Sequence, residues 1–150
     1  MQLFIGGACA GKRDLVASRF PEAVWLKMGE GADLSGWRDR LAPGRCLVIS
    51  GWLDWLAGAL VDDAGGADDP DDDRLRARLD AELAAMVEVE RRGHGEIVLI
   101  LSEVGRGIVP LEPADRRLRD LAGWLGQDAA ARAEAVWYVR HGLARCLTVT

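Results

Sequence analysis

Seven residues near the start of the chain, GGACAGK at positions 6–12, constrain its fold more than any other segment. They follow a short apolar run at residues 2–5, which predicts a buried strand. They precede residues 13–20, which predict a helix that ends before Pro21. Small residues between a strand and a helix let backbone N–H groups turn inward around phosphate oxygens, and the helix N-terminus adds partial positive charge. The segment therefore fits the GxxxxGK pattern of a phosphate-binding loop, in the structural context that this pattern requires.

The pattern assigns the loop to nucleotide binding and gives Lys12 a catalytic role, because its ammonium would reach the β- and γ-phosphates. The assigned nucleotide-binding residues are Gly6, Gly7, Ala8, Cys9, Ala10, Gly11, Lys12 and Arg13. Arg13 departs from the pattern, which places a serine or threonine there to hold Mg²⁺. A guanidinium offers no lone pair to a metal, although it can contact a phosphate as a bidentate donor. We expect ATP or GTP as the ligand and leave open whether Mg²⁺ is used. The alternative is a glycine-rich turn that binds nothing.

The rest of the chain alternates short apolar runs with helical segments, which predicts a mostly parallel α/β sheet with helices on both faces. Further strands are expected at residues 23–27, 46–50, 97–101, 135–139 and 143–149, and helices at 35–41, 52–61, 74–92 and 113–131. A break is expected in the last helix near Gly123 and Gly126. Residues 62–73, rich in aspartate, predict a solvated loop. The chain, residues 1–150, thus predicts one P-loop NTPase-like domain.

Composition argues against several classes of protein. The net charge of −5 argues against a general nucleic-acid-binding protein, because an acidic surface repels phosphate backbones. Three cysteines without a CxxC spacing argue against a disulfide framework and a structural zinc site. No apolar stretch approaches the roughly 18–20 residues of a membrane span. We therefore expect a cytoplasmic protein.

A second glycine-containing loop, SEVGRGIVP at positions 102–110, follows the expected strand at residues 97–101. Loops at the carboxyl ends of parallel strands face the ligand crevice of an open α/β sheet. We therefore expect Glu103 to lie near the first loop, where its carboxylate would orient the acceptor hydroxyl or Mg²⁺ as a second catalytic residue.

This second loop resembles the EVGxGIVP motif of the bifunctional adenosylcobinamide kinase/adenosylcobinamide-phosphate guanylyltransferase family, the CobU type. The likeness continues downstream, where the family's RxxRDxxGxxNQ pattern is matched by Arg116, Arg119, Asp120, Gly123 and Gln127. The family's GGARSGKS loop is similar to the segment at residues 6–12, and its DEVxxV strand is similar to residues 134–139. The resemblance covers these two blocks and leaves the middle of the chain poorly matched.

The resemblance implies a P-loop α/β fold, a homotrimer and two reactions. In the first reaction a nucleoside triphosphate phosphorylates the aminopropanol hydroxyl of adenosylcobinamide, and in the second GTP guanylylates that phosphate through a histidine–GMP intermediate. The partners would be a nucleotide and a corrinoid. Arg116 and Arg119 would bind a phosphate of the substrate, with exposed helix charges as the alternative.

Two features that the resemblance leads us to expect are missing. The two histidines, His94 and His141, lie outside the region where the family carries its guanylylated histidine, so we expect guanylyltransferase activity to be lost. The family's acidic residue at the end of the middle strand is Ser50 here, and Asp54, one helical turn further on, is a candidate replacement and substrate contact. The sequence predicts an adenosylcobinamide kinase. The alternative is a non-catalytic homologue that binds a nucleotide or corrinoid and partners another protein.

Overall fold

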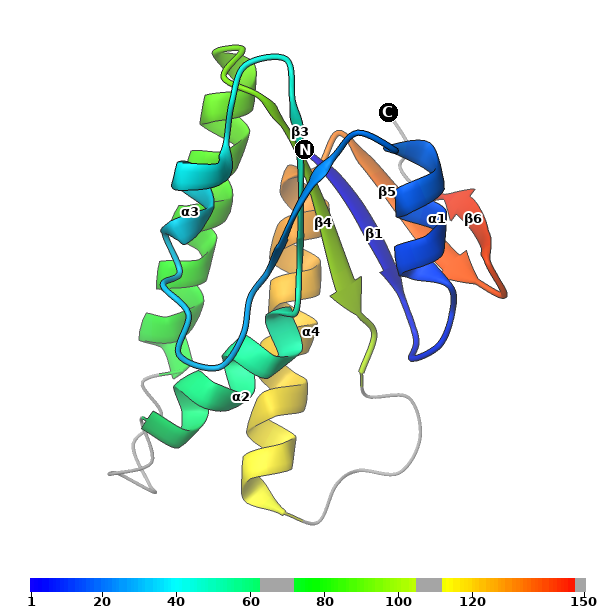
Figure 1. The fold of residues 1–150 in the computed structure, drawn as a ribbon. Coiled ribbons are helices and arrows are strands. Elements are labelled where there is room, and N and C mark those ends of the chain that lie inside the picture. Colours follow the sequence, from blue (N-terminus) through cyan, green and yellow to red (C-terminus); the bar gives the residue numbers. More distant parts are fainter. Residues whose placement is uncertain (63–71, 105–111, 148–150) are drawn as a thin grey trace.

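A six-stranded sheet in the order β2-β3-β4-β1-β5-β6 forms the centre of the computed structural model, which describes residues 1–62, 72–104 and 112–147 (Figure 1). The strands are β1 (Gln2–Gly6), β2 (Val24–Lys27), β3 (Cys46–Ser50), β4 (Glu96–Ser102), β5 (Ala135–Arg140) and β6 (Leu143–Cys146). The first five run parallel, and β6 pairs antiparallel with β5. The mostly parallel α/β sheet that the sequence predicts is confirmed.

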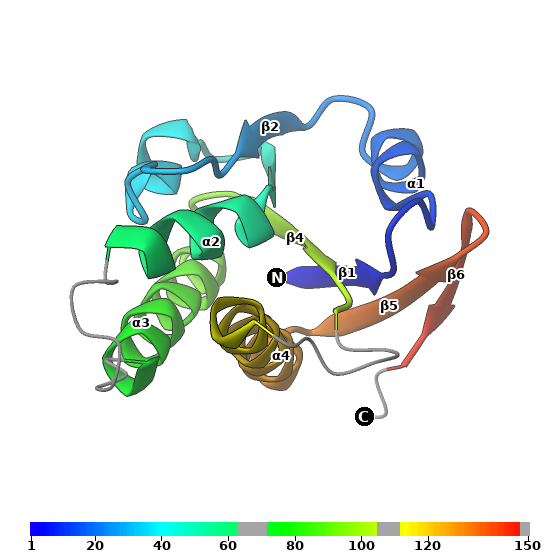
Figure 2. The same cartoon turned by 90° about the horizontal axis from the view of Figure 1, so that it is seen from below.

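Helices cover both faces of this sheet, as the sequence also predicts. Helix α1 (Lys12–Arg19) lies on one face, and Figure 2 shows the other three helices together on the opposite face. These are α2 (Trp52–Asp62), α3 (Asp72–Arg91) and α4 (Pro113–Arg132). The short helix expected at residues 35–41 is a 3₁₀ helix, η1 (Gly36–Arg40).

The predicted break in the last helix is wrong, because α4 is continuous through both glycines. A Cβ atom on Gly126 would lie 3.5 Å from Ile5 Cδ1, so this residue packs directly on the sheet. The helix propensity of glycine is about 1 kcal/mol below that of alanine, and packing of a long helix face outweighs such a cost.

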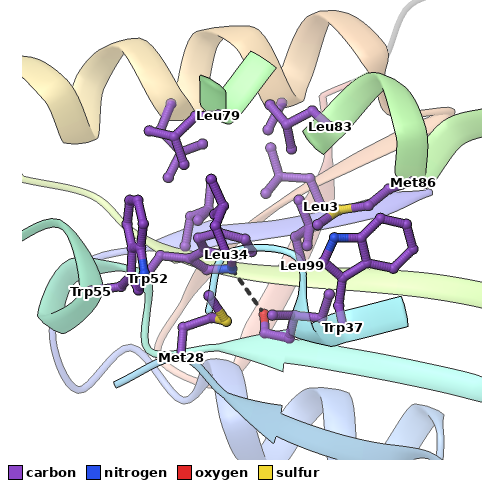
Figure 3. Close-up of a cluster of buried hydrophobic side chains, with 14 of the residues drawn as sticks. Leu3, Met28, Leu34, Trp37, Trp52, Trp55, Leu79, Leu83, Met86 and Leu99 are labelled. Carbon is purple, nitrogen blue, oxygen red and sulfur yellow. Dashed lines mark hydrogen bonds between the residues drawn. The ribbon is translucent and has the colours of Figure 1, made fainter. Parts of the chain in front are cut away.

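Strand side chains alternate between two apolar clusters, one on each face of the sheet. Phe4, Val48 and Val98 pack on the α1 side with Val16. The larger cluster fills the space between the sheet and the other helices, where Leu3 and Leu99 approach α3 (Figure 3). Because both faces are buried, the strands read as continuous apolar runs rather than as alternating ones.

Three arginine–aspartate pairs join α3 to α4. Their shortest N–O distances are 2.7, 2.9 and 3.0 Å, for Arg117–Asp72, Arg76–Asp128 and Arg132–Asp80. In each pair the guanidinium donates two hydrogen bonds to one carboxylate, an arrangement that gives geometric specificity in addition to a small stabilisation. They therefore fix how the two helices that cover the sheet lie against each other.

Two predicted segments fall largely outside the described residues, namely the aspartate-rich loop at residues 62–73 and the second glycine loop from residue 105 onward. None of the helices in the described ranges has the length and apolar character needed to cross a bilayer.

Candidate functional site

The loop at residues 6–12 turns at the carboxyl edge of the sheet, between β1 and α1. A Cβ on Gly6 would lie 2.3 Å from the carbonyl oxygen of Val139, so only glycine fits at the end of β1. Gly11 has a φ of +91° and approaches Gly142, whose N–H donates a 2.7 Å hydrogen bond to the carbonyl of Ala10. The turn between β5 and β6 therefore supports the loop from outside.

The ammonium of Lys12 is buried beneath this loop. Its Nζ donates hydrogen bonds to the carbonyl oxygens of Gly6 and Gly7, at 3.0 and 2.6 Å. Burial lowers the pKa of Lys12 below its ordinary value of 10.5, and the nearby Cys9 and Glu103 side chains partly oppose that shift. A desolvated ammonium that is held by two neutral carbonyls is stabilised electrostatically by any anion that enters the loop.

A cavity of about 530 Å³ opens beside the loop, and we call it the loop cavity. Its lining comprises residues 8–14, residues 50–54, Lys27, Ile100 and Ser102. Six of the eight residues assigned to nucleotide binding, and also Asp54, thus border one space, while Gly6 and Gly7 contribute the carbonyls that hold Lys12. That a nucleotide occupies this cavity stays a prediction.

The cavity lining carries three cations and two carboxylates. The cations are Lys12, Arg13 and Lys27, and the carboxylates are Asp14 and Asp54. Lys27 was not identified as a site residue from the sequence. Its position at the carboxyl end of an expected strand is a signal that could have indicated this role.

The residues of this chain do not reproduce the Mg²⁺ site that the family resemblance implies. The position of the metal-binding hydroxyl is Arg13, a guanidinium, and the strand end that would carry a carboxylate is Ser50. Across the described ranges, no group of three or more histidine, cysteine, aspartate or glutamate side chains is arranged to hold a metal. The side chains that line the loop cavity themselves supply positive charge, from Lys12, Arg13 and Lys27.

Glu103 lies at the end of β4, where its N–H donates a 2.8 Å hydrogen bond to the carbonyl of Gly6. The hydroxyl of Tyr138, on β5, donates a 2.9 Å hydrogen bond to Glu103 Oε2. These contacts place the carboxylate close enough to Lys12 to influence its pKa, as expected for a residue near the first loop. Tyr138, the only tyrosine of the chain, was not singled out from the sequence.

A second cavity, of about 590 Å³, lies between α4 and the sheet, and we call it the sheet cavity. Its lining is mostly apolar and includes Glu103, Gln127 and Tyr138. Ser102 lines both cavities, so the end of β4 separates them.

The two arginines assigned to substrate binding lie on the first half of α4, and neither borders the loop cavity. Arg116 is exposed and Arg119 is half-buried. Within the described residues, Nη1 of Arg119 is buried without a hydrogen-bond partner. Their role in phosphate binding stays a prediction.

We predict that Tyr138 is a positioning residue for Glu103. Replacing it by phenylalanine removes one hydrogen bond to a carboxylate, a change worth about 1.5–3 kcal/mol. If the chain has the kinase activity expected from its sequence, kcat should therefore fall by about 10-fold or more. The KM for nucleotide should stay nearly unchanged, because Tyr138 does not border the loop cavity. Steady-state kinetics measures both constants.

A double-mutant cycle with Glu103→Gln separates this role from a purely structural one. If Tyr138 acts through the carboxylate, Tyr138→Phe should have little further effect in the Glu103→Gln background. Independent, additive losses would contradict the assignment.

Three free cysteines give a direct test of where nucleotide binds. Cys9 borders the loop cavity and is exposed, Cys146 is exposed on β6, and Cys46 is half-buried. Burial, with Glu96 and Glu90 nearby, raises the pKa of the Cys46 thiol to about 11, so it should alkylate slowly. Saturating ATP or GTP should protect Cys9 from iodoacetamide and leave Cys146 reactive, as measured by mass spectrometry. Equal alkylation of Cys9 with and without nucleotide would count against binding in the loop cavity.

Neither histidine of the chain borders the loop cavity. His94 is exposed after α3, and its N–H donates a 3.0 Å hydrogen bond to the carbonyl of Val89. His141 is exposed in the turn between β5 and β6, with a φ of +54°. No histidine therefore lies among the residues that line the loop cavity.

The chain is similar to known proteins over most of its length. The family model described as CobU, cobinamide kinase / cobinamide phosphate guanyltransferase, matches residues 16–147. The matched residues begin just after the loop at residues 6–12, so the assignment of that loop stands on its sequence and geometry.

Three curated relatives are bifunctional adenosylcobalamin biosynthesis proteins. CobP of Pseudomonas aeruginosa is 38% identical over 106 residues, which cover 71% of this chain and 55% of the relative. CobU of Escherichia coli is 37% identical over 87 residues, which cover 56% and 48%. CobU of Salmonella typhimurium is 37% identical over 106 residues, which cover 69% and 58%. The chain thus spans about half the length of the curated relatives that it matches.

Proposed function

We propose that this chain, which belongs to the CobU family of cobinamide kinases / cobinamide phosphate guanyltransferases, uses a nucleoside triphosphate to phosphorylate adenosylcobinamide. The observation that carries the proposal is the burial of Lys12 under a glycine loop, beside a cavity at the carboxyl edge of a parallel sheet. This is the arrangement in which backbone amides and a lysine bind the β- and γ-phosphates of a nucleotide.

Phosphoryl transfer needs positioning and charge stabilisation more than covalent help from the protein. Residues 8–13 bind the triphosphate, and Lys12 leaves its carbonyl partners to contact the β- and γ-phosphates. The acceptor hydroxyl forms a bond to the γ-phosphorus as the bond to the bridging oxygen breaks, which releases a nucleoside diphosphate. Glu103, held by Tyr138, orients that hydroxyl and takes its proton. Asp54 and the pair Arg116 and Arg119 contact the acceptor substrate.

We propose that the chain has lost guanylyltransferase activity. A phosphoramidate intermediate requires an imidazole nitrogen as nucleophile. His94 and His141 are exposed, and neither borders the loop cavity. Incubation with labelled GTP should therefore leave no acid-labile, protein-bound GMP, whereas a labelled histidine would contradict the loss.

A coupled assay with adenosylcobinamide and either ATP or GTP tests the kinase. Turnover should release one nucleoside diphosphate for each phosphorylated corrinoid, and Lys12→Ala should remove it. No turnover above that control, under conditions in which nucleotide binds, would reject the proposal.

That negative result would favour a second candidate, a non-catalytic homologue that binds a nucleotide or a corrinoid and acts through another protein. Arg13 and Ser50 motivate it, because they replace two groups that organise the metal in an active P-loop enzyme. Calorimetry distinguishes the two: tight nucleotide binding without turnover supports this candidate.

A cytoplasmic homo-oligomer, a trimer by family resemblance, belongs to the same proposal. Leu143 and Leu147 are 74% and 50% exposed at the edge of the sheet around β6, and large exposed apolar residues at a sheet edge favour a subunit contact. Light scattering after gel filtration gives the oligomer mass, and a monomer at micromolar concentration would rule the trimer out.

A further inference from the structure

Lysine occurs at two positions of this chain, and both lysines border the loop cavity. The chain has 19 lysines and arginines in total, and all of them except these two lysines are arginines. Lys12 has an assigned role, whereas Lys27, at the end of β2, has none. Its side chain is exposed, and within the described ranges no hydrogen bond or ion pair engages its ammonium. An ammonium on a flexible stem is a point-charge ligand for phosphate.

Neighbouring residues direct Lys27 to the α1 side of the sheet. Trp25 packs in the cluster on the α1 side, and Lys27, two residues further along the strand, shares that face. The guanidinium of Arg13 lies over the Trp25 ring, 5.7 Å from its centroid. Arg13 from α1 and Lys27 from β2 therefore flank one side of the loop cavity.

Gly51 makes room for the Lys27 stem. Its φ is +77°, and a Cβ there would lie 2.9 Å from Lys27 Cγ and 2.2 Å from the carbonyl oxygen of Met28. With no side chain at this position, the lysine stem passes over the backbone after β3 and reaches the cavity.

We propose that Lys27 is a phosphate-binding residue which, together with Arg13, contacts the terminal phosphate of a bound nucleoside triphosphate. This inference rests on the proposed function. Lys27 is paired with Ser50 in the β2–β3 ladder, so a cation stands beside the strand end where the family resemblance implies an acidic, metal-organising residue. Arg13 likewise replaces the metal-binding hydroxyl. Lys27 and Arg13 thus supply protein charge at the two places where the bound metal would otherwise be organised, and the third phosphate is their ligand.

Binding measurements on three variants test this role. Lys27→Met keeps the apolar stem and removes the charge. It should weaken ATP binding by about 10-fold or more, which is the loss expected when a charge-assisted hydrogen bond is removed. ADP binding should weaken by less than about 3-fold, because ADP lacks the third phosphate. Lys27→Arg should retain most of the affinity. Arg78→Met, which removes one charge from an exposed site on α3, is the control and should bind ATP as the unchanged protein does. Calorimetry with ATP, GTP and ADP gives the dissociation constants, and circular dichroism confirms that each variant is folded.

Chemical labelling gives a second readout that does not depend on substitution. Because the chain has two lysines, acetylation by an N-hydroxysuccinimide ester can be followed at each one by mass spectrometry. The exposed Lys27 should react readily in the free protein, and ATP should slow its acetylation markedly more than ADP does.

The outcomes distinguish this inference from the function on which it rests. Weaker ATP binding in Lys27→Met, together with ATP protection of Lys27, supports it. If ATP binds in a Lys12-dependent way while Lys27→Met binds equally well and Lys27 stays reactive, Lys27 is a solvated surface cation and this inference alone is overturned. If the unchanged protein binds no nucleotide, both the inference and the proposed function are overturned.

Discussion

Lys12→Met should lower turnover in the kinase assay by about 10²–10³-fold, the usual loss when one preorganised group that stabilises transition-state charge is removed. ATP affinity should fall by about 10-fold or more, because a charge-assisted contact to phosphate is lost. Lys12 is the buried cation of the loop cavity, and its ammonium already faces the carbonyl oxygens of Gly6 and Gly7. Methionine keeps the stem in place, so the effect should come from the charge.

Thermal unfolding is the control for this variant. Burial lowers the pKa of Lys12, which means that the charged ammonium is less favourable in the folded protein than in the unfolded chain. Removing the charge relieves that cost and offsets the two lost hydrogen bonds, so the melting temperature should change little. A variant that keeps full turnover, or that loses it only because it unfolds, would contradict the assigned role.

The same pKa direction fixes the sign of the pH dependence. Between the lowered pKa of folded Lys12 and its ordinary value of 10.5, the unfolded chain holds the proton that the folded chain has lost. The contribution of Lys12 to stability therefore rises with pH through this interval, while its affinity for phosphate falls, because the neutral amine no longer attracts the anion.

Trp37→Ala should cost about 3–5 kcal/mol of unfolding free energy, a large part of the roughly 5–15 kcal/mol that a domain has in total. Trp37, in η1, is fully buried against the cluster shown in Figure 3. Its indole N–H donates a 2.8 Å hydrogen bond to Glu82, which also accepts hydrogen bonds from Ser35 and Arg38. The substitution leaves a cavity and removes one partner of a half-buried carboxylate.

Urea unfolding measures this effect, and Trp37→Phe is the matched control. Phenylalanine keeps most of the apolar volume and loses the hydrogen bond, so its cost should be about 1–2 kcal/mol. Equal costs for the two variants would assign the effect to the hydrogen bond with Glu82 rather than to packing.

Local patterns in the sequence were sufficient to predict the central architecture. The inner strands β1, β3, β4 and β5 are mostly short apolar runs, because both faces of the sheet are buried there. The loop at residues 6–12 could also be predicted, because its geometry requires glycine at two positions. A side chain at Gly6 would collide with Val139, and Gly11 has a positive φ. The expected proximity of Glu103 to this loop followed from the rule that parallel strands end at one edge.

Contacts between segments distant in sequence could not be predicted. Nothing in the local pattern indicates that Arg13 stacks on Trp25, that Lys27 enters the same cavity, or that Tyr138 binds Glu103. Each depends on strand order and on which face a side chain takes, and neither is fixed by composition or spacing. The wrong prediction of a break in α4 has a similar origin, because glycine was weighed by propensity without the sheet against which Gly126 packs.

The hydrogen bond from Gly142 to Ala10 has a consequence for how the protein is made. Among the described strands of the sheet β1 comes first in sequence, yet it lies between β4 and β5, and the loop that follows it is held by the turn after β5. A nascent chain therefore carries the loop at residues 6–12 out of the ribosome long before the strands that shape this loop exist. Because contacts this distant in sequence form late, the proposed nucleotide binding should be acquired abruptly, once the β5–β6 hairpin has emerged from the exit tunnel.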